Sequence, residues 1–299
     1  ILVFTIHHTS NNLLLEEIQL HCITIFDNYK VNLLSKEDTN FLNTFIDELP
    51  EPTLNNNTIA QNRKDEQKRK DDNNKNYKEL TDHEIEWSKE LLELSKAFKI
   101  IEVLWQILKN RSGSLKKDQL EDLLFDIENL WLRLMSYLLE MIKSDDFANS
   151  IEKMINLYEE SKWNKYVSDA DKKKYIDKFI QNMWLRTIIW ILFKIFQSVN
   201  IEQLLHLQRN ITKKNKYPSY QLLYSLFNLN YWKLKYKELK DLYNEFSEDK
   251  NNLALKTLSF FIQIYMNNHY IEPNERQSLH SLLWIKKYSP NKVSKNIWK

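Results

Sequence analysis

The scarcity of glycine is the feature that most limits what this chain can be. Its 299 residues include a single glycine, Gly113, where average usage would give about twenty. Phosphate-binding loops and the sharp turn that carries a hydrolase serine each need two or more glycines, because a Cβ would clash where backbone meets a ligand or reverses. The sequence therefore excludes Walker, Rossmann, kinase and G-x-S-x-G sites within these residues.

The charge and cysteine content limit the classes of partner and site that this chain can have. The 43 basic and 41 acidic residues leave a formal net charge of +2, so the chain as a whole creates no field that would attract nucleic acid or an anionic membrane. Its one cysteine, Cys22, permits no internal disulfide and no cysteine-based zinc site. We therefore expect Cys22 to be a small buried side chain and the protein to be cytoplasmic.

The spacing of apolar residues predicts an all-α fold. Apolar side chains recur at steps of three and four, and strand signals are nearly absent. The expected architecture is an irregular multi-helix bundle or an α-solenoid. After an apolar helical run over 11–34, the expected helices lie at 36–48, 147–163, 169–198, 201–212, 219–229, 235–247, 252–268 and 273–285.

A long antiparallel helical hairpin is predicted over about 82–143. Thr81 and Glu84 have the spacing of a capping box at its start. Gly113 is expected in the left-handed conformation after the first helix, with Ser114 capping the second. Two long helices with a short connection should pack side by side. The two apolar seams are Trp87, Leu91, Leu94, Phe98, Ile101, Trp105 and Leu108, and Leu120, Leu124, Ile127, Trp131, Leu134, Leu138 and Met141.

Composition divides the chain into four parts. Residues 1–49 are expected to be a short helical segment at the cut edge of a longer chain, because no initiator Met precedes them. Residues 50–80 have almost no apolar side chains and are predicted to be a disordered polar linker. Residues 81–285 form the predicted bundle, and residues 286–299 are a basic tail with five lysines and no acidic residue.

Polar residues with catalytic or metal-binding potential are few. Asp118, Asp122 and Asp126 are four residues apart and could bind a divalent metal or form a solvated acidic helix face. Arg276 and His280 approach the Arg–His spacing of HEPN ribonucleases, but only three residues separate them, which is more typical of an exposed helix face. We therefore assign no catalytic, cofactor or metal residues, and keep a small helical nuclease, HEPN-like or metal-dependent, as an alternative function.

One candidate binding surface lies on the most apolar helix. The run Met183–Phe196 is the one candidate for membrane insertion, but it is shorter than a span and contains Arg186 and Lys194. We expect it to be buried in protein. An arginine in such a helix needs a partner, so Arg186 either forms an ion pair or reaches the bundle edge, or else lines a partner or ligand groove with Lys194.

A second candidate surface is the segment 209–240. It is rich in lysine, arginine and aromatic residues. Basic side chains can contact phosphates and aromatic rings can stack on bases, although aromatic residues at helical spacing are also typical of a core. A nucleic-acid-binding module is therefore another alternative. The candidate patch consists of Arg209, Lys213, Lys214, Lys216, Trp232, Lys233 and Lys235.

The region around Gly113 resembles a known family. Ile100–Leu115 reads IIEVLWQILKNRSGSL, which resembles the helix-turn-helix near the carboxyl end of large bacterial STAND-type NTPases, where an E-x-L-G-Q-I-L-K-N run leads to a G-S-L turn. Trp105 replaces the glycine of that run. Asn251–Leu258 and Glu272–Gln277 are similar to the last helices of the same regions, so the resemblance covers about residues 82–290.

That family places a helical sensor or scaffold after its nucleotide-binding core, and many members serve in anti-phage defence. The resemblance implies no catalytic residue and no cofactor in this chain. It implies a protein partner, or the protein's own upstream domain, as the ligand. We accordingly predict a non-catalytic scaffold or sensor region that acts through protein–protein contacts.

Overall fold

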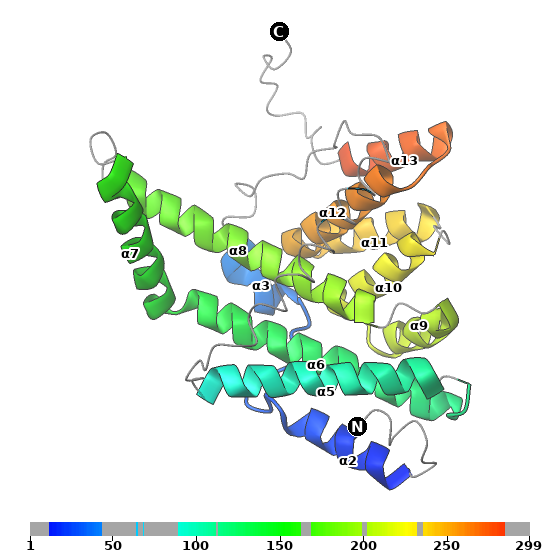
Figure 1. Cartoon of the computed structure of the whole chain (residues 1–299). Helices are drawn as coiled ribbons and strands as arrows, with labels where there is room; N and C mark the ends of the chain where they lie inside the picture. Colours follow the sequence, from blue (N-terminus) through cyan, green and yellow to red (C-terminus); the bar gives the residue numbers. More distant parts are fainter. Residues whose placement is uncertain are drawn as a thin grey trace.

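The computed structural model describes residues 12–43, 64, 68, 89–111, 113–162, 169–198, 202–231 and 236–284. Within these ranges it contains eleven α-helices and no strand, which confirms the all-α fold (Figure 1). The predicted cap at Thr81, the seam residue Trp87 and the basic tail lie outside the described residues, as does the predicted linker apart from Lys64 and Lys68.

Most helices begin and end within two residues of their expected bounds. The first is an exception, because it ends at Thr24 and the chain continues through turns and extended backbone to Ser35. The helices are α2 (Asn12–Thr24), α3 (Lys36–Asn43), α5 (Lys89–Arg111), α6 (Lys117–Lys143), α7 (Asp145–Lys162), α8 (Asp169–Ser198), α9 (Leu205–Lys214), α10 (Pro218–Asn230), α11 (Tyr236–Glu248), α12 (Asn252–Asn268) and α13 (Pro273–Trp284), with a 3₁₀ helix (Glu202–Leu204) before α9.

Short polar side chains set several helix starts. The Ser35 Oγ accepts a hydrogen bond from the Asp38 N–H at 3.3 Å and so caps the start of α3. The Ser144 Oγ accepts from the Phe147 N–H at 3.2 Å, so α7 begins directly after α6. Asp145 and Asp146 lie in the first turn of α7, where negative charge is favourable.

The connection between α5 and α6 differs from the expectation. Gly113 does not have a positive φ, and a Cβ built on it would meet nothing within 4 Å. The prediction of a left-handed glycine was therefore wrong, because Gly113 lies in an open part of the connection. Ser114 does not cap α6 either: Lys116 is the N-cap, and its N–H donates to the Gln119 Oε1 at 3.2 Å.

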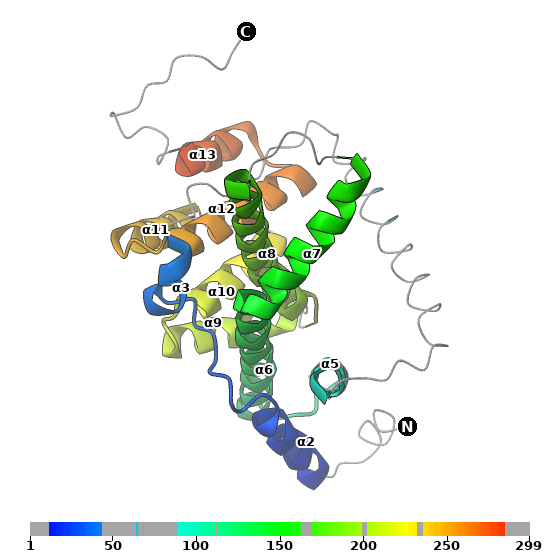
Figure 2. The same cartoon turned by 90° about the vertical axis from the view of Figure 1, so that its left-hand side faces the viewer.

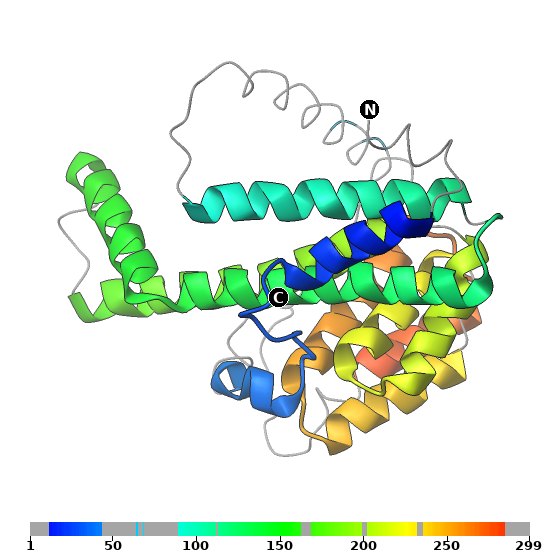
Figure 3. The same ribbon diagram turned by 90° about the horizontal axis from the view of Figure 1, so that it is seen from below.

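Helix α6 is the centre of the bundle. It contacts α2, α5, α7, α8 and α9, and Figure 3 shows α5 running antiparallel beside it as the predicted hairpin. Because neighbours surround α6, its buried surface extends beyond one seam and Leu123, Leu130 and Met135 are fully buried. Met141, at the far end of the predicted seam, is exposed.

The segment before residue 44 belongs to the same core. Cys22 is fully buried, as expected. The Asn251 side chain donates to the Leu34 carbonyl at 2.8 Å, and the Ser219 N–H donates to the Leu33 carbonyl at 3.1 Å. Helix α3 thereby packs against α12. Contacts between such distant parts of the chain are those of a bundle, since repeats in a solenoid contact only their neighbours.

Candidate functional site

Helix α8 is buried on one face and open on the other. It packs against α6, α7, α10 and α12, and Ile188, Ile191 and Leu192 are fully buried. In Figures 1 and 2 it crosses the bundle from the end of α7 to α10. By length and composition its segment Lys173–Ser198 could cross a membrane, and half of the most apolar window is buried in protein.

Arg186 lies on the open face. Its side chain is exposed, so it lies at the edge of the bundle, which is one of the placements that the sequence left open. The reason is that neighbouring helices do not cover this side of α8. Lys194 is half-buried, and its Nζ lies 5.8 Å from the centre of the Trp190 ring, within range of a cation–π interaction.

Large aromatic side chains accompany Arg186 on this face. We define the α8 stripe as Tyr175, Phe179, Arg186 and Trp190. Steps of four, seven and four residues place them along one side of a helix. The aromatic side chains are 63%, 47% and 41% exposed, in chain order. Single exposed apolar residues are common, but three aromatic rings on one stripe form a patch of the kind that marks an interaction site.

The carboxyl-terminal end of the stripe is fixed by ring contacts. Trp190 meets Phe98 of α5 edge to face with ring centres 6.5 Å apart, and meets Trp131 of α6 at 6.2 Å. Phe98 and Trp131 are themselves 5.6 Å apart. This edge-to-face triangle restrains the Trp190 ring while leaving part of its surface in solvent.

The structure does not gather the predicted nucleic-acid patch into a uniformly basic surface. Arg209, Lys213 and Lys216 are exposed, whereas the Lys214 Nζ lies 2.5 Å from the Glu121 Oε1. The hydrogen bond to Glu121 raises the pKa of Lys214, with smaller contributions from two further carboxylates of α6. A phosphate approaching Lys214 would therefore meet acidic side chains. The remaining patch residues, Trp232, Lys233 and Lys235, lie outside the described residues.

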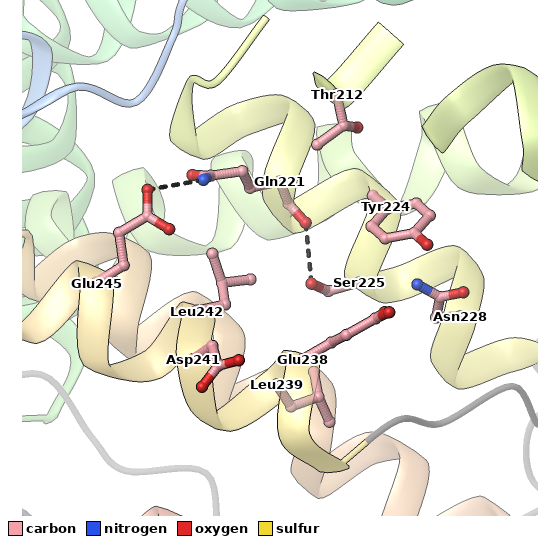
Figure 4. A pocket seen from close by; sticks show the side chains of 10 residues that line it. All are labelled: Thr212, Gln221, Tyr224, Ser225, Asn228, Glu238, Leu239, Asp241, Leu242 and Glu245. Atoms are coloured by element: carbon pink, nitrogen blue, oxygen red, sulfur yellow. Dashed lines mark hydrogen bonds between the residues drawn. The ribbon is translucent and has the colours of Figure 1, made fainter. Parts of the chain in front are cut away.

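A pocket of about 250 Å³ lies between α10 and α11, at the end of α9 (Figure 4). Its charge is opposite to the one expected for segment 209–240, because the described residues of its lining include three acidic ones and no basic one. We call it the α10–α11 pocket. It is lined by Thr212, Gln221, Tyr224, Ser225, Asn228, Glu238, Leu239, Asp241, Leu242 and Glu245.

Matched spacing on two antiparallel helices builds this pocket. Gln221 lies opposite Glu245, and its Nε2 donates to the Glu245 Oε1 at 2.9 Å. The Ser225 Oγ donates back to the Gln221 carbonyl at 2.9 Å. Asn228, one turn further along α10, is opposite Glu238 at the start of α11 in Figure 4. The sequence carries this signal as equal polar spacings on both sides of a short connection, and we did not predict the pocket from it.

A buried carboxyl lies where α6 meets α9. Glu128 is fully buried, and within the described part of the chain neither of its oxygens has a partner with good hydrogen-bond geometry. Burial raises its pKa to about 8, although the adjacent Gln208 amide acts in the opposite direction. Glu128 is therefore mostly protonated at neutral pH, which reduces the cost of burying it.

The other predicted polar sites remain apart. Asp118 and Asp122 are exposed, whereas Asp126 is half-buried and accepts from the Gln19 Nε2 at 2.9 Å. In the described ranges, no group of three or more His, Cys, Asp or Glu side chains could hold a metal ion. Arg276 is exposed, and burial together with Arg276 lowers the pKa of His280.

Comparison with protein families, curated proteins and solved structures finds no match. The function of the chain must therefore be inferred from its own surfaces. The resemblance to STAND-type regions, the role in defence and the cytoplasmic location all stay predictions.

Proposed function

We propose that this chain is a non-catalytic helical scaffold or sensor region that binds another protein through the α8 stripe. The observation that carries the proposal is the exposure of three aromatic side chains on one face of α8. Tryptophan, tyrosine and arginine are the residue types that contribute most to binding energy at interfaces. All three occur on this stripe.

The dimensions of the stripe suit a protein ligand. Tyr175 and Trp190 are 15 residues apart, which corresponds to about 22 Å along a helix axis. That length matches one face of a partner helix laid along α8. Arg186 lies between the aromatic residues, where its planar group of donors can bind a carboxylate or backbone carbonyl of the partner.

Preorganisation favours Trp190 as the main anchor. Phe98 and Trp131 already restrain its ring, so binding would cost less side-chain entropy there than at a freely rotating residue. Tyr175 and Phe179 are more exposed and would extend the contact. A bacterial STAND-type NTPase provides one context for this surface, in which the partner is a second protein or the protein's own upstream domain.

Site-specific photo-crosslinking tests the proposal. In the protein expressed in its own cells, the photo-reactive residue benzoyl-phenylalanine is introduced in place of Phe179. The matched control replaces Tyr270, which is 65% exposed between α12 and α13. We expect a defined crosslink to one protein, or to the upstream part of the same protein, from position 179 and none to that species from position 270.

Variants of the stripe then decide whether the crosslinked protein is the partner. With both proteins purified, Trp190→Ala should weaken binding by at least thirtyfold, as expected for an aromatic anchor. Arg186→Met should weaken binding while leaving the melting temperature unchanged. Tyr270→Ala should change neither quantity. Equal crosslinking from both positions, or binding that is indifferent to Trp190, would refute a role for the stripe.

A further inference from the structure

We propose that the α10–α11 pocket binds an arginine side chain from a basic segment of a partner protein. The pocket shares no residue with the α8 stripe, so this inference does not depend on the proposed function above. Its basis is the combination of charge, apolar surface and size at one place, described in turn below.

Charge selects a cationic ligand. Among the lining residues that the structure describes, Glu238, Asp241 and Glu245 are acidic and none is basic. Figure 4 shows their carboxylates pointing in different directions along α11 instead of toward one point. Such an arrangement suits an elongated organic cation better than a metal ion, which needs several oxygens at one centre.

The apolar part of the lining suits the stem of the ligand. Leu239 is buried and Leu242 is half-buried between the acidic residues. A methylene stem can lie on these leucines while its charged end reaches a carboxylate. Tyr224 contributes an aromatic ring to the same pocket, against which a guanidinium can stack.

Size and geometry favour arginine over other cations. A volume of about 250 Å³ is smaller than the usual range for cofactor and drug sites and suits one long side chain. A guanidinium has a planar group of donors that can bond a carboxylate such as Glu238 and the amide oxygen of Asn228 together. A lysine ammonium is a compact charge on a flexible stem. It has no planar surface to stack on the Tyr224 ring while it bonds the two separated acceptors.

Titration of the isotope-labelled chain tests the proposal directly. The probe is a capped pentapeptide, Ala-Ala-Arg-Ala-Ala, and the side-chain amide signals of Gln221 and Asn228 report on the pocket. We expect saturable shifts with a dissociation constant on the order of millimolar, since one side chain supplies most of the contact. The same peptide with citrulline, which keeps the shape of arginine without its charge, should bind at least tenfold more weakly.

Matched variants on α11 separate the pocket from a general acidic field. Glu238→Gln should weaken the arginine peptide at least fivefold, whereas Glu248→Gln, at the end of the same helix and outside the pocket, should change the affinity less than twofold. Tyr224→Leu removes the aromatic ring without changing the charge of the pocket and should also weaken binding. Equal losses in the two glutamate variants, or equal binding of the citrulline peptide, would overturn the proposal.

A truncated chain tests the other source of positive charge. Removal of residues 286–299, which contain five lysines, should leave the Gln221 and Asn228 signals in place. If those signals move on truncation, and the lysine-rich segment added as a peptide restores them, the chain's own tail is the occupant and the partner arginine is excluded.

Discussion

The α8 stripe and the α10–α11 pocket show two ways in which a helical bundle can offer side chains to a partner. The stripe is one face of a long helix that its neighbours leave uncovered, and it presents aromatic rings around Arg186. The pocket lies between two antiparallel helices and presents carboxylates above buried leucine. The first surface needs a partner that supplies its own concave or helical face, whereas the second can bind a single inserted side chain.

The two surfaces also differ in what supports them. Trp190 is restrained by aromatic rings from two other helices, so the stripe depends on the packing of α5, α6 and α8 together. The pocket depends on a local hydrogen bond between Gln221 and Glu245. Apart from Trp190, which belongs to both, changes on α8 should therefore separate into a stabilising face and a binding face, while changes at the pocket should have small effects on stability.

The largest effect is expected on the buried face of α8. Ile191→Ala removes a fully buried side chain and should lower the free energy of unfolding by about 3 kcal/mol through lost burial and a cavity. Arg186→Ala, on the open face of the same helix, should change it by less than about 0.5 kcal/mol. Urea denaturation followed by circular dichroism measures both. Similar losses in the two variants would show that the stripe is part of the core.

The next effect concerns the buried carboxyl of Glu128. The pKa of Glu128 is about 8 in the folded chain and 4.5 as the ordinary value. Between these pH values unfolding releases a proton, so rising pH destabilises the folded state until both forms are ionised above pH 8. Glu128→Gln keeps the shape without the titration and should stabilise the protein at pH 7 by on the order of 3 kcal/mol.

Melting curves at several pH values check this prediction. The melting temperature of Glu128→Gln should exceed that of the wild type by several degrees at pH 8 and by little at pH 4.5. Glu102→Gln, an exposed position on α5, is the control and should follow the wild type. Parallel pH profiles for the wild type and Glu128→Gln would mean that the folded-state pKa of Glu128 is not raised.

A smaller effect is expected at the pocket itself. Gln221→Ala removes the hydrogen bond to Glu245 at a solvent-exposed site, so the free energy of unfolding should fall by about 0.5 to 1 kcal/mol. The same variant should shift the Asn228 amide signal, because the two helices are then held together less firmly. A loss as large as that of Ile191→Ala would instead identify the pocket as a main contact between α10 and α11.

Local sequence signals predicted most of the fold. The expected spans 169–198 and 252–268 coincide with α8 and α12, since helix starts and apolar periodicity lie in neighbouring residues. The helix expected over 11–34 ends early, because Phe26 and Leu34 adopt positive φ angles of 56° and 53°. Both side chains are buried in the core, and this tertiary packing, which a local pattern does not contain, offsets an unfavourable backbone conformation.

The binding surfaces were less predictable because each depends on more than one helix. Helix α8 is apolar nearly all round, so its sequence does not specify which face α6 and α12 cover, and the sequence left open whether Arg186 forms an ion pair or reaches the bundle edge. Segment 209–240 looked basic along the chain, yet Lys214 is paired with Glu121 of α6. The acids at positions 241 and 245, just beyond that segment, line the pocket. Charge summed along a segment therefore does not give the charge of a surface.

The smallest effect is expected in the α5–α6 connection, which belongs to neither surface. Gly113 has no positive φ, and a Cβ there would meet nothing within 4 Å, so Gly113→Ala introduces neither strain nor a clash. Because alanine restricts the unfolded chain more than glycine does, the variant should leave the melting temperature unchanged or raise it by the equivalent of about 0.5 kcal/mol. A decrease of more than about 1 kcal/mol in the free energy of unfolding would indicate that Gly113 does adopt the left-handed conformation predicted from the sequence. It would also make Gly113 the residue on which the hairpin, and with it the Phe98 support of the α8 stripe, depends.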